Sequence, residues 1–314
     1  MSAPVMIQFT EGVLGAAVRM ATPILLGTMG EILTEKAGIL NLGIEGIMLM
    51  GALTGFLTTI ATGSLWAGVL AACLVGMIFG LLMSLLTVKL GLSHHVAGLG
   101  ITLLCTGLAM YIYRLVVGSP TVPPTVHPFT TVPIPLLSKI PFIGNVFFNQ
   151  YVLTYIAFLS VPLLSFLLNR TSAGLAVRTV GDNPFAADTA GIHVTMVRTL
   201  CVTSGAGIMG VAGAFMTLAH QNMFLAEVVG GRGWVCIAMV IFGNWNPYVA
   251  ALGALGFGLM DGLQLRLQNM GLSLPFDLFL LIPYLMTLVA LIIMSGRSGA
   301  PLALLQPYRR EDKV

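Results

Sequence analysis

The chain has 314 residues, of which 57% are hydrophobic and only 8% charged, and its mean hydropathy is +0.97. A soluble domain is about 45–50% apolar and about 25% charged, so this composition excludes a soluble globular protein. The formal net charge of +3 is small and dispersed, and it gives no indication of nucleic acid as a partner.

Long apolar runs indicate helices that cross a membrane. No charged residue lies between Glu45 and Lys89, a length that holds two crossings of ~20 residues each. Transmembrane strands would instead alternate apolar and polar residues in segments of ~10. We therefore expect an all-α membrane protein, a polytopic transmembrane bundle, because only helices satisfy their own backbone polar groups in lipid.

The apolar runs divide at polar, glycine or proline clusters into about nine crossings. The segment at 234–244 is too short to span comfortably, so we expect a tilted or broken helix there. The crossings lie near residues 7–32, 40–62, 65–90, 96–117, 151–168, 194–219, 234–244, 248–267 and 274–295.

The positive charges predict an orientation. With a cytoplasmic C-terminus, nine Lys and Arg residues lie on the inner side and four on the outer side, while Arg19 falls inside the first crossing. The single membrane domain, 1–314, would then carry an outer loop at 118–150, an inner loop at 170–193 and a cytoplasmic tail at 296–314. Seven prolines suit the outer loop to an extended lid or a simple connector.

Several polar residues lie within the crossings, where ionisable groups are costly and often functional. Glycines at 38, 43 and 46 surround Asn41 and Glu45 and could break a helix beside a cavity; an ordinary inter-helix turn is the alternative. Trp234 could stack on a flat base or anchor a helix at the interface. Asp261 and Gln264 share a helix face and could line a polar seam, or Asp261 could pair with a basic residue.

The inner loop contains the stretch GLAVRTVGDNPFAADTAGI at residues 174–192. Pro184 suits a first helical turn, so we expect a short helix over 184–190, capped by Asp182 or Asn183 and ended by Gly191. Its alanines would form a smooth surface for a groove on a partner, with Phe185 as an apolar anchor. The alternative is a helix that only orders the loop.

Two distant motifs resemble those of ABC importer permeases of the ribose and branched-chain amino acid class. Residues 21–52 resemble the signature of the nucleoside-type branch through Glu35, Gly38, Ile39, Leu40, Asn41, Leu42, Gly43, Glu45 and Gly46. The inner loop is similar to the coupling-helix loop of that class through Gly181, Asn183, Ala186, Ala187, Gly191 and Ile192. Further similarities at 140–144, 231–234, 281–287 and 306–311 extend the likeness over almost the whole chain.

The resemblance implies a type II ABC importer-like permease that imports nucleosides across a bacterial inner membrane. It implies three partners: a related second permease subunit in a heterodimer, a cytoplasmic ATP-binding cassette ATPase, and an outer substrate-binding protein or lipoprotein. No stretch resembles the phosphate loop GxxxxGK[ST], so ATP would be hydrolysed on a partner, without a cofactor here. No catalytic or metal-binding pattern occurs, and all four cysteines fall in apolar runs.

The resemblance and the polar pattern together yield two sets of candidate residues. The ATPase-coupling set is Gly181, Asp182, Asn183, Pro184, Phe185, Ala186, Ala187, Ala190 and Gly191. The substrate-pathway set is Asn41, Glu45, Trp234, Asp261 and Gln264. The alternatives are the same machinery with a ribose-like sugar or another small polar solute and, more distantly, an ion-driven secondary carrier with paired carboxylates at the midplane.

Overall fold

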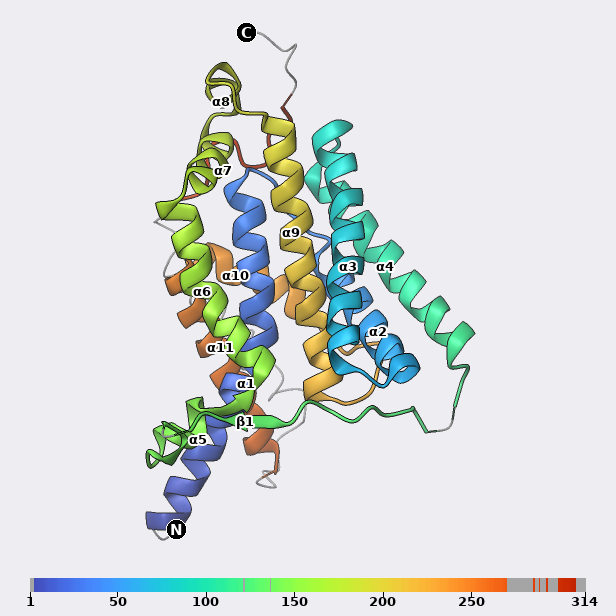
Figure 1. Ribbon diagram of the computed structural model, residues 1–314, viewed down its shortest axis with the longest axis vertical. Helices are drawn as coiled ribbons and strands as arrows, with labels where there is room; N and C mark the ends of the chain where they lie inside the picture. Colours follow the sequence, from blue (N-terminus) through green and yellow to red (C-terminus); the bar gives the residue numbers. More distant parts are fainter. Residues whose placement is uncertain are drawn as a thin grey trace.

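The computed structural model describes residues 3–120, 122–135, 137–269 and 299–308, together with Leu285, Leu288 and Ile292. It is a helical bundle with one two-stranded ribbon (Figure 1). Its elements are α1 Ala3–Lys36, α2 Ile44–Thr62, α3 Leu65–Ser84, η1 Leu85–Lys89, α4 His94–Val116, β1 Thr131–Pro133, η2 Leu137–Lys139, α5 Ile143–Phe147, β2 Asn149–Tyr151, α6 Val152–Arg170, α7 Ser172–Asp182, α8 Pro184–Thr189, α9 Val194–Phe215, η3 Met216–His220, α10 Arg232–Phe242 and α11 Pro247–Asn269.

The described helices confirm the predicted fold class, an all-α polytopic membrane bundle. Six of them are long and apolar enough to cross a membrane: α1, α2, α3, α4, α6 and α9. The segment expected to be tilted or broken is α10, whose 11 residues are about half of a full crossing. The ninth predicted crossing, 274–295, lies outside the described residues except for Leu285, Leu288 and Ile292.

Helices α1, α2 and α9 are the most buried of the long helices and form the core of the bundle. In Figure 1, α6 and α4 lie at its two sides. In the central three, 67–78% of the residues across each crossing are buried, against 28% in α4 and 33% in α6. Small residues let these helices approach closely: Gly51 of α2 faces Gly210 of α9, and Gly30 of α1 faces Gly205 of α9. A Cβ at Gly30, Gly51 or Gly205 would overlap the backbone of the facing glycine, and one at Gly210 would overlap the backbone of Ala72 in α3, as expected for membrane helices packed through small residues.

The two ends of the bundle carry different structures (Figure 1). Helices α7 and α8 lie at one end, which we call the α8 end. The short helix α5 and the β1–β2 ribbon lie at the other, the α5 end, and α1 runs the whole distance between them. A site at one end can therefore reach the other through a single central helix.

The proline-rich segment crosses the α5 end in an extended conformation. Strand β1 pairs antiparallel with β2, with Val132 opposite Gln150. The backbone N–H of Val126 donates to the carbonyl of Asn222 at 2.9 Å, and that of Phe129 donates to Leu218 at 2.9 Å. These hydrogen bonds attach the segment to η3, which continues α9, and to the turn after it, so the proline-rich segment is held in place over the helices.

Candidate coupling surface and intramembrane polar centre

Helix α8 begins as the sequence predicts. Asn183 is extended, its side-chain Oδ1 accepts a hydrogen bond from the Ala186 N–H at 3.0 Å, and Pro184 follows in the first turn. Gly191 has a φ of +84°, a left-handed conformation that glycine adopts without strain. Of the two predicted caps, Asn183 therefore serves α8, whereas Asp182 ends the helix before it.

Helix α7 was not predicted, because residues 170–193 form one long polar stretch in the sequence. Thr171 caps this helix by accepting a hydrogen bond from the Gly174 N–H at 3.0 Å. Its buried residues are Gly174, Val177, Val180 and Gly181, a helical spacing that could have revealed it. Gly181 packs against the Lys36 carbonyl at the end of α1, so α7 seats α8 on the central helix.

The candidate coupling residues divide by exposure. Ala187 is only 2% exposed and packs against Val180 of α7 and Val194 of α9, so it holds α8 to its own chain. Gly181 and Pro184 are also buried. The exposed members are Asp182, Asn183, Phe185, Ala186, Ala190 and Gly191. We call Phe185, Ala186 and Ala190 the free face of α8; beside it lies a hollow of about 210 Å³.

The segment 299–308 connects the α8 end to the central helices. The Ala303 N–H donates to the Gly181 carbonyl at 2.9 Å, and the Leu305 N–H donates to the Gly38 carbonyl at 3.2 Å. Tyr308 meets the ring of Phe185 edge to face, with centroids 5.2 Å apart. Through this segment, a displacement of α8 would act directly on the end of α1.

Helix α10 begins inside the bundle, and Glu45 of α2 binds its N-terminus. The Glu45 carboxylate accepts hydrogen bonds from the N–H groups of Gly231 at 2.8 Å and Gly233 at 2.7 Å. The first N–H groups of a helix lack partners within it and attract negative charge. Gly233 permits the contact, because a Cβ there would lie 2.7 Å from the Glu45 backbone.

An ion pair completes this site. Arg232 Nη2 lies 3.0 Å from Asp261 Oδ2 of α11, and the two side chains are 19% and 13% exposed. Of the two interpretations of Asp261, pairing with a basic residue is the arrangement observed. We call Glu45, Gly231, Arg232, Gly233 and Asp261 the α10 centre; Trp234, 39% exposed, follows it on α10.

The other two pathway candidates lie outside the α10 centre. Asn41 is fully buried in the turn between α1 and α2, where its N–H donates to Glu31 Oε1 at 2.9 Å and its own Oδ1 accepts from the Gly43 N–H at 3.0 Å. Gln264 is 4% exposed on α11. Asn41 therefore orders the chain that leads into Glu45, and the pathway role of both residues stays a prediction.

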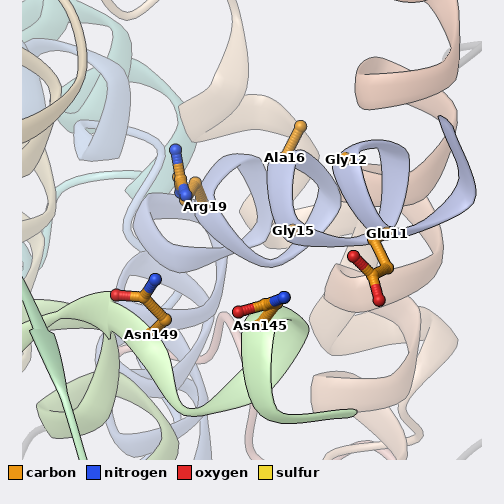
Figure 2. A pocket seen from close by; sticks show the side chains of 7 residues that line it. All are labelled: Glu11, Gly12, Gly15, Ala16, Arg19, Asn145 and Asn149. Carbon is orange, nitrogen blue, oxygen red and sulfur yellow. The ribbon is translucent and has the colours of Figure 1, made fainter. Parts of the chain in front are cut away.

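A second polar region, which the sequence did not reveal, lies at the α5 end. A hollow of about 430 Å³ separates α1 from the α5 segment, and Glu11, Asn145 and Asn149 face it (Figure 2). Arg19 also lines it, and its Nε donates to Gln150 Oε1 at 3.1 Å, 131 residues along the chain. A partner so distant in the sequence gave no local signal.

Within the ranges that the structure describes, no three His, Cys, Asp or Glu side chains are grouped to hold a metal ion, and the four cysteines are free thiols. The polar groups of the α10 centre instead pair with one another. Such an arrangement can offer donors, acceptors and a cationic group to a polar solute inside the bundle.

Comparisons with known proteins agree on one family. The family described as branched-chain amino acid transport system, permease component, matches residues 13–291. A Haloferax volcanii protein named as a candidate glucose ABC transporter permease is 36% identical over 96% of this chain and 99% of its own length. The guanosine ABC transporter permease of Bacillus subtilis is 31% identical over 96% of this chain and 98% of its own.

The nucleoside ABC transporter permease of Lactococcus lactis is 32% identical over 90% of this chain and 92% of its own. No solved structure matches the chain. The resemblance drawn from the two motifs is thus confirmed over nearly the whole length. The chain belongs to the permease components of the branched-chain amino acid transport system family, and it is the membrane-spanning permease subunit of an ATP-binding cassette importer rather than an enzyme.

Proposed function

We propose that this permease subunit imports nucleosides across a bacterial cytoplasmic membrane. The support is the nucleoside-type signature around Asn41 and Glu45, together with relatives named for guanosine and nucleoside transport that match at least 90% of the chain. In this proposal the α8 end and the tail at 296–314 face the cytoplasm, in keeping with the nine Lys and Arg residues on that side.

The single observation that supports a transport pathway at this place is the short helix α10, whose N-terminus is bound by Glu45. A discontinuous helix inside a bundle presents backbone groups and a positive dipole end, the usual surroundings of a solute site in transporters. Trp234 beside it offers an aromatic face for a base. We assign the pathway to Glu45, Trp234 and Asp261 together with Asn41 and Gln264, of which Asn41 also orders the turn that leads into α2.

The two ends of the bundle would bind different partner proteins. The free face of α8 would contact the ATPase. Asn183 and Pro184 fix the start of the helix, Ala187 packs it against α7 and α9, Gly181 seats α7 on α1, and the exposed Asp182 and Gly191 flank α8. The hollow at the α5 end would lie beneath the outer binding protein. The apolar, exposed sides of α4 and α6 would face lipid or the related permease subunit.

A hexose is the second candidate cargo, because the Haloferax volcanii relative named for glucose is 36% identical to this chain. The ion-driven carrier has no comparable support, since the chain belongs to an ABC permease family.

Uptake assays test the proposal. Cells lacking this subunit would be compared with cells carrying it on a plasmid, using labelled guanosine, uridine and glucose. We expect nucleoside uptake to require the subunit and its ATPase, while glucose uptake stays unchanged. Loss of glucose uptake alone would establish the hexose alternative, and nucleoside uptake that survives removal of the ATPase would contradict the proposal.

A further inference from the structure

Two carboxyl groups inside the bundle have no role in the function proposed above. Glu31 and Glu35 lie one turn apart on the same face of α1 and are 0% and 1% exposed. The chain contains only 11 acidic residues, so two that are adjacent and buried in a central helix require a physical explanation.

Each carboxyl group accepts one hydrogen bond from a different segment. Glu31 Oε1 accepts from the Asn41 N–H at 2.9 Å, and Glu35 Oε2 accepts from the Trp245 indole N–H at 2.6 Å. The remaining oxygens, Glu31 Oε2 and Glu35 Oε1, are buried and have no donor among the described residues. Because residues four apart on a helix are neighbours, with Cβ atoms about 5–6 Å apart, these two acceptor groups lie side by side.

No basic side chain neutralises the pair, since no Lys, Arg or His nitrogen in the described parts of the chain lies within 4.0 Å of either carboxyl. Arg198 of α9 points its Nε at the Ala37 carbonyl and its Nη1 at Gln306. The other charged or titratable groups of the surrounding elements are Lys36 on α1, Glu45 on α2, Arg178 and Asp182 on α7, Cys201 on α9, Cys236 on α10 and Tyr308.

Two ionised carboxylates in contact and away from water repel each other and lose their hydration, whereas one shared proton removes both costs. We propose that Glu31 and Glu35 form a proton-binding site, in which one proton bridges Glu31 Oε2 and Glu35 Oε1. The pair then carries a single negative charge, and its outer oxygens remain acceptors for Asn41 and Trp245.

The proton site holds the turn that follows the C-terminal end of α10, because Glu35 accepts the hydrogen bond from Trp245. Trp245 lies in the turn between α10 and α11, where Asn244 and Trp245 have φ of +49° and +57°, uncommon for residues other than glycine. Glu45 binds the start of α10, and the Glu31–Glu35 pair binds the turn after its end. The protonated pair therefore fixes the position of the half-helix independently of which solute the importer carries.

Infrared spectroscopy of the full chain in lipid nanodiscs tests the site. We expect a protonated-carboxyl stretching band at neutral pH that is lost or strongly reduced in both Glu31→Gln and Glu35→Gln, and that is unchanged in the control Glu11→Gln. A band of equal intensity in the wild type and in both Gln variants would overturn the proposal.

Thermal unfolding supplies a second measurement. Gln mimics a protonated carboxyl, so Glu31→Gln and Glu35→Gln should stay within about 2 °C of the wild type, whereas Glu35→Ala should fall by about 5 °C or more. Between about pH 4.3, the pKa of an unfolded glutamate, and neutral pH the folded wild type holds a proton that the unfolded chain releases. Its Tm should therefore fall by roughly 3 °C per pH unit over this range, and that of Glu31→Gln should not. Equal pH dependence of the two proteins would contradict the shared proton.

Discussion

The free face of α8 and the α10 centre are both small regions proposed to be functional, but they differ in the interactions that their side chains make. All three residues of the free face of α8 are exposed. In the α10 centre every charged group has a partner: Glu45 binds two backbone N–H groups, and Arg232 binds Asp261. Partnered charges away from water are strongly coupled to stability.

This difference separates two kinds of substitution. A change on the α8 face should alter the contact with a partner while the bundle stays folded. A change in the α10 centre should reduce stability and transport together, because it leaves a buried polar group without a partner. Four experiments, from the largest expected effect to the smallest, would break or sharpen the distinction.

Glu45→Ala should have the largest effect. It leaves the N–H groups of Gly231 and Gly233 without an acceptor, which we expect to cost about 2–4 kcal/mol of unfolding free energy and to abolish uptake. Thermal unfolding and nucleoside uptake would be measured together, and Glu11→Ala, which changes a partly exposed carboxyl at the α5 end, would be the matched control for unfolding. If Glu45→Ala is as stable as the control, the carboxylate does not hold α10.

Asp261→Asn should have an intermediate effect. The ion pair with Arg232 is partly exposed, so its loss should cost about 2 kcal/mol, less than that of a fully buried pair. Uptake should fall by about tenfold. Combining Asp261→Asn with Arg232→Gln should recover part of the lost stability, because no unpaired charge then remains; strictly additive losses would indicate that the two side chains do not interact.

Ala187→Arg and Ala186→Arg form a matched pair on α8. Position 187 is buried, so a long charged side chain there should cost about 1–3 kcal/mol by overpacking against Val180 and Val194. Position 186 is exposed, and the same substitution should change stability by no more than about 0.5 kcal/mol while it abolishes co-purification of the ATPase. Normal ATPase binding by Ala186→Arg would mean that the free face is not the docking surface.

Tyr308→Ala should have the smallest effect on transport. It removes one edge-to-face contact with Phe185, worth about 0.5–1 kcal/mol, and leaves the free face intact. Faster proteolysis within 299–308, with uptake reduced by less than about threefold, is the expected result. An unchanged rate of cleavage would show that the aromatic contact does not hold the segment in place.

The same contrast explains what the sequence could predict. The start of α8 depends on residues within three positions of each other, so Asn183 and Pro184 revealed it. The exposed side of α8 was not predictable in the same way: Ala187 was expected on the docking surface, but its burial depends on Val180 and Val194 of neighbouring helices. A charged residue at 187 therefore tests packing, and the docking test belongs at Ala186.

The α10 centre was predicted only in part. Hydropathy indicated a short segment near 234–244 and drew attention to Glu45 and Asp261. The partner of Glu45 lies 186–188 residues away in the sequence, and that of Asp261 lies 29 residues away. Local patterns do not encode such pairings in a single sequence, and the same holds for Glu31 and Trp245, neither of which was singled out.

Site-specific photocrosslinking of the assembled importer would test most directly whether the free face of α8 contacts the ATPase. A photoreactive residue would be placed at Ala186, with the buried Ala187 as the matched control, and the importer would be irradiated with and without ATP. We predict a crosslink from position 186 to the ATPase and much less from position 187. The absence of any crosslink from position 186 to the ATPase, in either nucleotide state, would contradict the account.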